Sequence, residues 1–146
     1  MSGTQTTKGA KAKLALILHS GTYDRLHQAM SIVQAGVAND MEVHVLFTYH
    51  ALESLIQGKM DTAELERSGS RLAESFTENI REGKVETPTQ MLKRAKALGD
   101  VHVYACSLSM ALINVKKEDL GEEVEKPMGY VSFLNIAEGA AVTLYI

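Results

Sequence analysis

Short apolar runs alternate with segments of helical periodicity along most of the chain. Residues 14–18 (LALIL) and 43–47 (VHVLF) are largely apolar, which is typical of strands buried on both faces of a parallel sheet. Between them, apolar residues recur at spacings of three and four (Leu26, Met30, Val33, Val37), which predicts a helix over residues 22–39. The chain therefore opens with a strand, a helix and a second strand.

The same order continues to the last residue. The pattern predicts a short helix over 51–57, a third strand over 101–105, helices over 107–114 and 130–138, and a terminal strand over 141–146, with a weaker strand near Val124. This alternation of strands and helices predicts an α/β fold with an open, mainly parallel sheet covered by helices.

The helix that follows Thr87 has the clearest start and stop signals. Thr87 is expected to be the N-cap, Pro88 takes the first helical position, Gln90 completes a capping box, and Gly99 stands just past the end. One face of this helix is expected to be apolar (Met91, Ala95, Leu98).

The segment from 58 to 86 is strongly charged but keeps some helical spacing (Leu65, Leu72, Phe76, Ile80). We expect it to be helical with a break at residues 68–70. A solvated helix packed on the sheet is the simpler interpretation, and a lid or a subunit contact is the alternative.

Composition limits the class of protein. The chain has 146 residues, of which 45% are hydrophobic and 23% charged, as expected for one globular domain over residues 13–146, with a polar, disordered arm over 1–12. The formal net charge is −3 and basic residues are not interleaved with aromatic ones, so a nucleic-acid partner is not expected. No apolar stretch is long enough for a membrane span or a signal peptide, and we expect a cytoplasmic protein.

The chain contains one cysteine, Cys106, so it cannot form an internal disulfide or a cysteine-rich metal site. No spacing of histidines and carboxylates matches a metal motif, and the methionines fit core positions better than soft-metal ligands. The sequence therefore predicts no metal and no cofactor.

Cys106 ends the third predicted strand, directly before Ser107 opens a helix. Aligning residues 41–52 with 99–110 on their shared Val-His-Val places Thr48 opposite Cys106, at the carboxyl edge of the sheet where ligands bind in open α/β folds. A thiol before a helix start can be a reactive thiolate, whereas a free cysteine is also often a small buried apolar residue. Both interpretations stay open.

Three loops are expected to share this edge with the thiol. They are 19–23 after the first strand, 48–50 after the second, and the late turn 127–130. Gly21 would leave backbone amides free for an anion. The candidate binding residues beside Cys106 are therefore Ser20, Gly21, Thr22, Tyr23, Thr48, Tyr49, His50, Ser107, Met128 and Gly129. His44 and His102 begin their strands and are expected at the opposite edge, while His27 is expected to be solvated or at a subunit contact.

Several of these stretches resemble one known family. SGTYDRLHQAMSIVQAGVANDMEVHVLFTYHAL, VYACSLSMALI, the KEDL turn and MGYVSFLNIAEGA are together similar to the DsrE/DsrF-like family, especially to its members labelled peroxiredoxin-like, and the resemblance runs from about Lys13 to Ile146. It implies a three-layer α/β/α sandwich of about five strands that assembles into homo-oligomers, often trimers or hexamers. It also implies that Cys106 carries sulfur as a persulfide or a bound thiosulfonate.

The peroxiredoxin label fits poorly, because Val103 stands where true peroxiredoxins have a threonine and no arginine is near in sequence. Three functions are therefore weighed. The first is a sulfur carrier of sulfurtransferase type acting through Cys106, with sulfur donors and acceptors that are proteins or small sulfur species. The second is a non-catalytic module that binds or senses a small anion or metabolite. The third is a structural oligomer with a buried cysteine.

Overall fold

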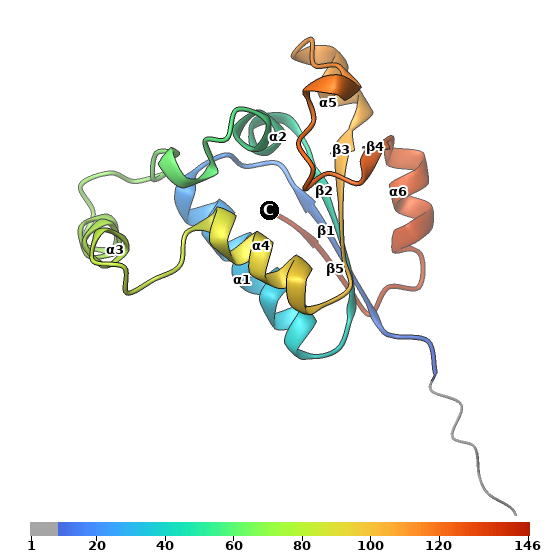
Figure 1. The fold of residues 1–146 in the computed structure, drawn as a ribbon, viewed down its shortest axis with the longest axis horizontal. Coiled ribbons are helices and arrows are strands. Elements are labelled where there is room, and N and C mark those ends of the chain that lie inside the picture. The colour runs from blue at the N-terminus through green and yellow to red at the C-terminus, as the bar shows by residue number, and fades with distance from the viewer. Residues whose placement is uncertain (1–8) are drawn as a thin grey trace, which may run out of the picture.

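In the computed structural model, which describes residues 9–146, five strands form one sheet in the order β4-β3-β2-β1-β5 (Figure 1). All four neighbouring pairs are parallel. The strands are β1 (Lys13–Leu18), β2 (Glu42–Phe47), β3 (Val101–Cys106), β4 (Lys126–Met128) and β5 (Val142–Tyr145). The predicted parallel sheet of about five strands is confirmed, and the weak strand expected near Val124 forms two residues later as β4.

Helices cover both faces of this sheet, which gives the three expected layers. The helices are α1 (Tyr23–Ala38), α2 (Tyr49–Ile56), α3 (Arg71–Arg81), α4 (Pro88–Leu98), α5 (Ser107–Leu112) and α6 (Tyr130–Ala137). Helices α1 and α4 pack side by side on one face, and α6 lies alone on the other (Figure 1). Helices α2 and α5 begin where β2 and β3 end, so they stand at the carboxyl edge.

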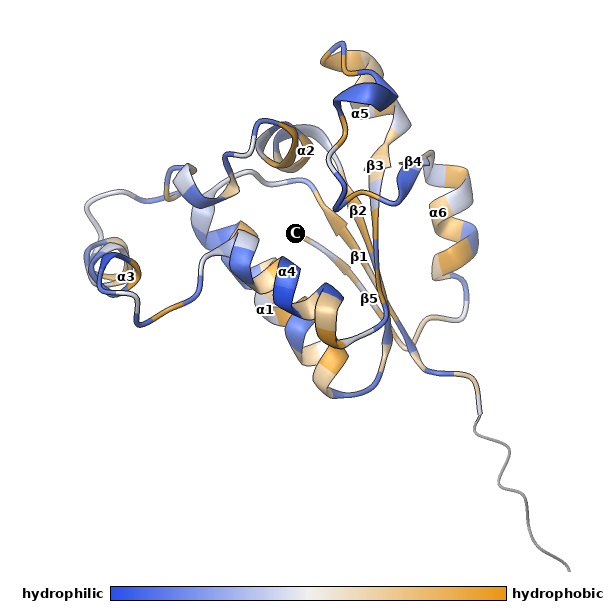
Figure 2. Cartoon of the chain, viewed as in Figure 1, coloured by the Kyte–Doolittle hydropathy of each residue, from blue (hydrophilic) through white to orange (hydrophobic). Residues whose placement is uncertain are grey.

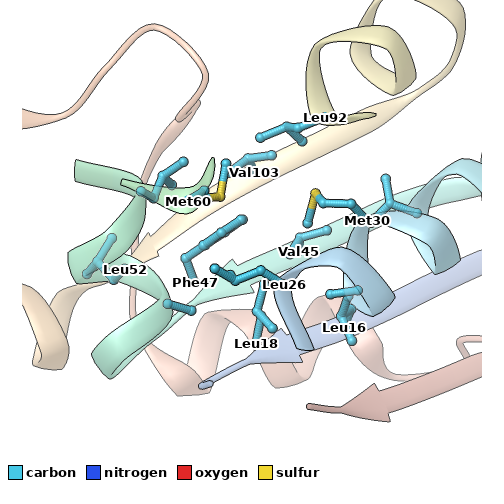
Figure 3. Close-up of a cluster of buried hydrophobic side chains, with 14 of the residues drawn as sticks. Leu16, Leu18, Leu26, Met30, Val45, Phe47, Leu52, Met60, Leu92 and Val103 are labelled. Carbon is cyan, nitrogen blue, oxygen red and sulfur yellow. The ribbon is translucent and has the colours of Figure 1, made fainter. Parts of the chain in front are cut away.

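Side chains that alternate along each strand enter two separate apolar clusters. Leu16, Val45 and Phe47 point to the α1 and α4 face, where Figure 3 shows them against Leu26 and Met30 of α1. Residues on the other face of the same strands pack under α6 (Ala15, Leu46, Tyr104, Cys106). Because both faces of β1, β2 and β3 are covered, these three strands are mostly apolar and do not alternate between apolar and polar residues.

The side on which strands are added to the sheet changes once, when β5 pairs with the free edge of β1. From β1 to β4 each new strand is added on the same side, and β5 then returns to pair with β1. Right-handed connections put the helix of a returning connection on the opposite face, which is where α6 lies. Because β1, β2 and β3 pair in parallel, their carboxyl ends meet at one edge of the sheet, as the sequence predicted.

The start of α4 is as predicted: the Thr87 side chain accepts from the Gln90 N–H, and the Gln90 side chain accepts from the Thr87 N–H. Asp61, in the short 3-10 helix η1 (Met60–Thr62), accepts hydrogen bonds from the Thr87 hydroxyl and the Thr89 N–H. One residue of this helix that was expected on its apolar, buried face is exposed. Leu98 is 70% exposed and lines the groove between α1 and α4 with Val37.

The segment 58–86 was expected to be helical with a break at residues 68–70. The break is confirmed by the turn over 66–69, but the helix expected before it is wrong, because that part contains only the short η1. Only α3 is a regular α-helix, and it lies away from the sheet with a mainly hydrophilic surface (Figures 1 and 2). Gly69, with φ of +81°, turns the chain, and the Ser70 side chain caps α3 by accepting from the Ala73 N–H. Leu72, one of the apolar residues at helical spacing, is 69% exposed.

Gly9 to Ala12 have no regular structure and are exposed, and the rest of the predicted arm, residues 1–8, lies outside the described residues. Within residues 9–146, every helix is too short or too polar to cross a membrane.

Candidate functional site

Cys106 is the last residue of β3 and the N-cap of α5. Its side chain is completely buried, on the face of the sheet that α6 covers. In the sheet register it stands beside Met128, and it packs with Leu46, Tyr104 and Phe133. The thiol is therefore at the predicted edge, but in this conformation it is closed to solvent.

Two hydroxyl groups lie beside the thiol. The pKa of Tyr130 is raised to about 12, mainly by burial and then by a hydrogen bond to Cys106 and the charge of its thiolate, while a hydrogen bond with Thr48 acts in the opposite direction. Thr48 is buried and also donates to the Leu18 carbonyl oxygen over 3.3 Å. Since the phenol keeps its proton at neutral pH, the Tyr130 hydroxyl is available as a donor beside the sulfur.

The pairing of Phe47 with Ala105 places Thr48 opposite Cys106, as the alignment of the two segments predicted. The next residue, Tyr49, has a φ of +46°, and its N–H donates to the Ser109 hydroxyl over 2.9 Å. This bond joins the start of α2 to α5, directly behind the thiol.

Two residues beside the thiol, Ser109 and Tyr130, were not among the predicted site residues. Ser109 is completely buried, although a serine in a helix usually faces water. The available signal was its position three residues after Cys106, where a side chain faces back towards the helix start.

Four of the predicted binding residues gather in a separate groove. It has a volume of about 700 Å³, and its lining includes Ser20, Gly21, Thr22, His50 and Arg25. A Cβ atom on Gly21 would lie 2.8 Å from the His50 carbonyl oxygen. The glycine is therefore required by the close packing of the β1–α1 loop against α2, which is a different reason from the exposed amides that the sequence suggested.

The charges of the groove do not favour an anion. Arg25 makes a two-point ion pair with Glu66, with both N···O distances 3.0 Å. Lys59 is the other cationic side chain besides the histidines, while Glu53 and Glu64 add two more carboxylates. The groove thus carries at least as much negative charge as positive.

The other predicted residues are spread over both regions and beyond. Tyr49 lies with its ring 5.0 Å from that of His19, which also contacts the rings of His50 and Tyr145. Ser107 is exposed, Met128 is buried beside the thiol, and Gly129 caps α6.

Tyr23 points away from the groove into the core. Its ring packs on Phe76 of α3, and burial together with the charge of Asp61 raises its pKa to about 12. Its hydroxyl makes no hydrogen bond within residues 9–146.

His27 was expected in solvent or at a subunit contact. Within the chain it is half-buried against α3, so the solvated position is wrong, while the subunit contact stays a prediction. Its ring packs 4.9 Å from Phe76 and stacks on Tyr23. Burial lowers its pKa, against a hydrogen bond with the Glu86 backbone that acts the other way. The reason is α3, whose position the sequence did not predict.

Comparisons with known proteins find a family model, a sequence relative and a solved structure that are similar to this chain. A family model described as DsrE/DsrF/DrsH-like matches residues 58–145, which include Cys106 and Tyr130. The uncharacterized protein YrkE of Bacillus subtilis (strain 168) is 26% identical over 165 residues, covering 98% of this chain and 99% of YrkE. Among solved structures, the protein of unknown function MTH1491 from Methanobacterium thermoautotrophicum superposes with a TM-score of 0.53 at 17% identity, over 92% of this chain and 97% of that one.

Proposed function

The chain belongs to the DsrE/DsrF/DrsH-like family, and from this premise we propose that it is a sulfur carrier of sulfurtransferase type. It holds sulfane sulfur or thiosulfate on Cys106 and passes it to a partner. The observation that carries the proposal is the position of the chain's one thiol, at the carboxyl edge of the sheet with the Tyr130 and Thr48 hydroxyls beside it.

The chemistry needs only a thiolate and two sulfur compounds. With thiosulfate, the Cys106 thiolate attacks the sulfane sulfur, a new S–S bond forms, and sulfite leaves with the electron pair of the bond that breaks. A thiolate of the acceptor then attacks the outer sulfur of the persulfide, and Cys106 leaves as a thiolate. Electrons balance in this transfer without an external oxidant or reductant. To hold thiosulfate itself, the Cys106 thiolate attacks an inner sulfur of tetrathionate, and thiosulfate leaves with the electron pair of the S–S bond that breaks. The acceptor is a second molecule, because the chain has no other cysteine.

Because the thiol is buried, part of the site must move before Cys106 can react. A sulfur donor reaches Cys106 only if the start of α6, with Tyr130, or the neighbouring Met128 moves aside. We therefore expect native Cys106 to react slowly with iodoacetamide, and we expect Tyr130→Ala to speed this reaction. Rapid alkylation of the folded wild type would contradict the closed site.

The direct test is intact-protein mass spectrometry after incubation with thiosulfate, tetrathionate or polysulfide. Wild type is expected to gain sulfur-containing adducts that a reductant removes, and Cys106→Ser is expected to gain none. Tyr130→Phe is the matched variant, since it keeps the ring but loses the hydroxyl, and it is expected to load more slowly. A folded wild type that stays unmodified would overturn the carrier function and favour the structural or binding role.

The proposed setting is the cytoplasm, where reducing conditions keep a single thiol free. The proposed working form is a homo-oligomer, a trimer or hexamer by the family resemblance, and its support is the set of exposed apolar side chains on α5 and α6 (Leu108, Leu112, Val131, Leu134).

A further inference from the structure

A second cluster of titratable side chains, made of histidines and a carboxylate, lies at the opposite edge of the sheet, where the strands begin. His44 of β2 and His102 of β3 are direct neighbours in the register, and their rings stack with centroids 4.8 Å apart. Glu42, two residues before His44, points to the same face. One ligand atom from each of Glu42, His44 and His102 lies within 4.8 Å of the others. We propose that these three residues bind a divalent transition-metal ion of the zinc class.

The types of donor fit this ion. Two imidazoles and one carboxylate are a common protein ligand set for Zn²⁺, with metal–ligand bonds of about 2.0–2.2 Å. Such bonds bring ligand atoms to roughly 3.4 Å from each other, so a small approach of the three side chains is enough. The two imidazole planes are 13° apart, and they must tilt towards a shared point for both to coordinate. The His102 side chain is 30% exposed and has room for this movement.

The second nitrogen of each histidine is already held. His44 Nδ1 is hydrogen bonded to the Tyr104 hydroxyl over 2.8 Å, while His44 Nε2 lies 2.6 Å from Glu42. His102 Nδ1 lies 2.8 Å from a carboxylate oxygen of Glu125. Partners of this kind orient the rings of metal-binding histidines and increase their basicity.

Charge and access also favour a cation. Asp100 lies 2.7 Å from His102 Nε2, Glu125 lies 2.8 Å from His102 Nδ1 and Glu42 lies 2.6 Å from His44 Nε2, so three carboxylates surround the two rings. Lys13, which is next to Glu42 in the register, directs its ammonium group to the Ile136 carbonyl oxygen. His44 is 5% exposed and closes the inner side, whereas Glu42 and His102 are partly exposed and leave the outer side open.

No local motif in the sequence indicates this site, because its two histidines come from different strands and meet only through the sheet register. The site also does not depend on the proposed sulfur chemistry. His102 and Cys106 are on the same face of β3, but they stand at opposite ends of the strand.

The test is calorimetric titration of the chelator-treated full chain with Zn²⁺, together with Co²⁺ titration followed by visible absorption. We expect saturable binding of one ion per chain in wild type and in Cys106→Ser. We expect His102→Gln to weaken binding about tenfold or more while circular dichroism shows a native fold. Glu42→Gln is the second variant should His102→Gln fail to fold, and the same weakening is expected.

The matched control is the double variant His19→Gln/His50→Gln, which removes the histidine pair at the other edge and is expected to bind Zn²⁺ as wild type does. Absence of saturable binding, or equal affinity in folded His102→Gln, would overturn the metal site. Loss of binding in Cys106→Ser would also overturn it, since the thiolate would then be the ligand.

Discussion

Gly21 shows how one absent Cβ atom shapes the edge that carries the candidate site. Gly21→Ala would place a methyl group 2.8 Å from the His50 carbonyl oxygen, which is backbone and cannot easily move. We expect the free energy of unfolding, measured by urea denaturation, to fall by about 1–3 kcal/mol. At Gly129 a Cβ atom would meet nothing within 4 Å, so Gly129→Ala is expected to cost under about 1 kcal/mol. Equal losses in the two variants would contradict the packing role of Gly21.

His27 makes stability depend on pH with a definite sign. Burial lowers its pKa in the folded chain, so the unfolded chain binds a proton more readily. As pH falls through the unfolded value of about 6.5, this difference favours unfolding, and its contribution to stability declines. We expect His27→Gln to lose less stability than wild type between about pH 7.5 and about pH 5.5 in urea denaturation. His50→Gln, which removes an exposed imidazole, is the control and should keep the wild-type pH dependence. Parallel curves for wild type and His27→Gln would show that His27 is not the group responsible.

The part of the candidate site that lies at the ends of the strands was predictable from the sequence. Thr48 and Cys106 end neighbouring strands, and the register places them together. The separation of the thiol from the Ser20–Thr22 groove was not predictable, because it depends on which face of the sheet each side chain meets. Burial of Cys106 depends on α6, a helix that follows a strand of only three residues.

At the scale of elements, α4 and α3 have similar N-caps but different surroundings. The Thr87 side chain caps α4, which packs on α1 and contributes Met91 and Leu92 to the core. We expect Thr87→Ala to lower the global free energy of unfolding by about 0.5–2 kcal/mol in urea. Ser70 caps α3, whose buried part within the described chain is Ala73. Ser70→Ala is expected to leave the global transition almost unchanged while it speeds amide exchange and proteolysis within residues 71–81. A global loss of the same size in both variants would contradict the peripheral position of α3.

The elements that local signals define were predicted well, and those held by distant contacts were not. Periodicity and a capping box were sufficient for α1 and α4. In the segment before α3, the spacing of Leu65 suggested a helix, but hydrogen bonds to the start of α1 hold this segment as a loop. The Tyr23 N–H donates to the Glu64 carbonyl oxygen, and Asp24 accepts from the Glu66 N–H. These partners are about forty residues apart, so no local pattern could indicate them.

For the whole molecule, the outer face of α6 argues for self-association. Val131 is 77% exposed and Leu134 is 58% exposed, and Figure 2 shows that α6 consists largely of hydrophobic residues. Exposed apolar patches commonly mark interaction surfaces, and the net charge of −3 is small enough for copies of the chain to approach.

We therefore expect light scattering after size-exclusion chromatography to give a mass that is a multiple of the chain mass, and we expect Leu134→Glu to reduce it. Leu72→Glu is the control, because Leu72 is also exposed (69%, against 58% for Leu134) but lies on α3, away from α6. Since α6 also carries Tyr130, an interface on its outer face would restrict the movement that uncovers Cys106. Leu134→Glu should then also raise the alkylation rate of Cys106 relative to Leu72→Glu. If Leu134→Glu leaves the mass at the wild-type value, or wild type itself is monomeric, α6 is not the interface and the closed thiol must be explained within one chain.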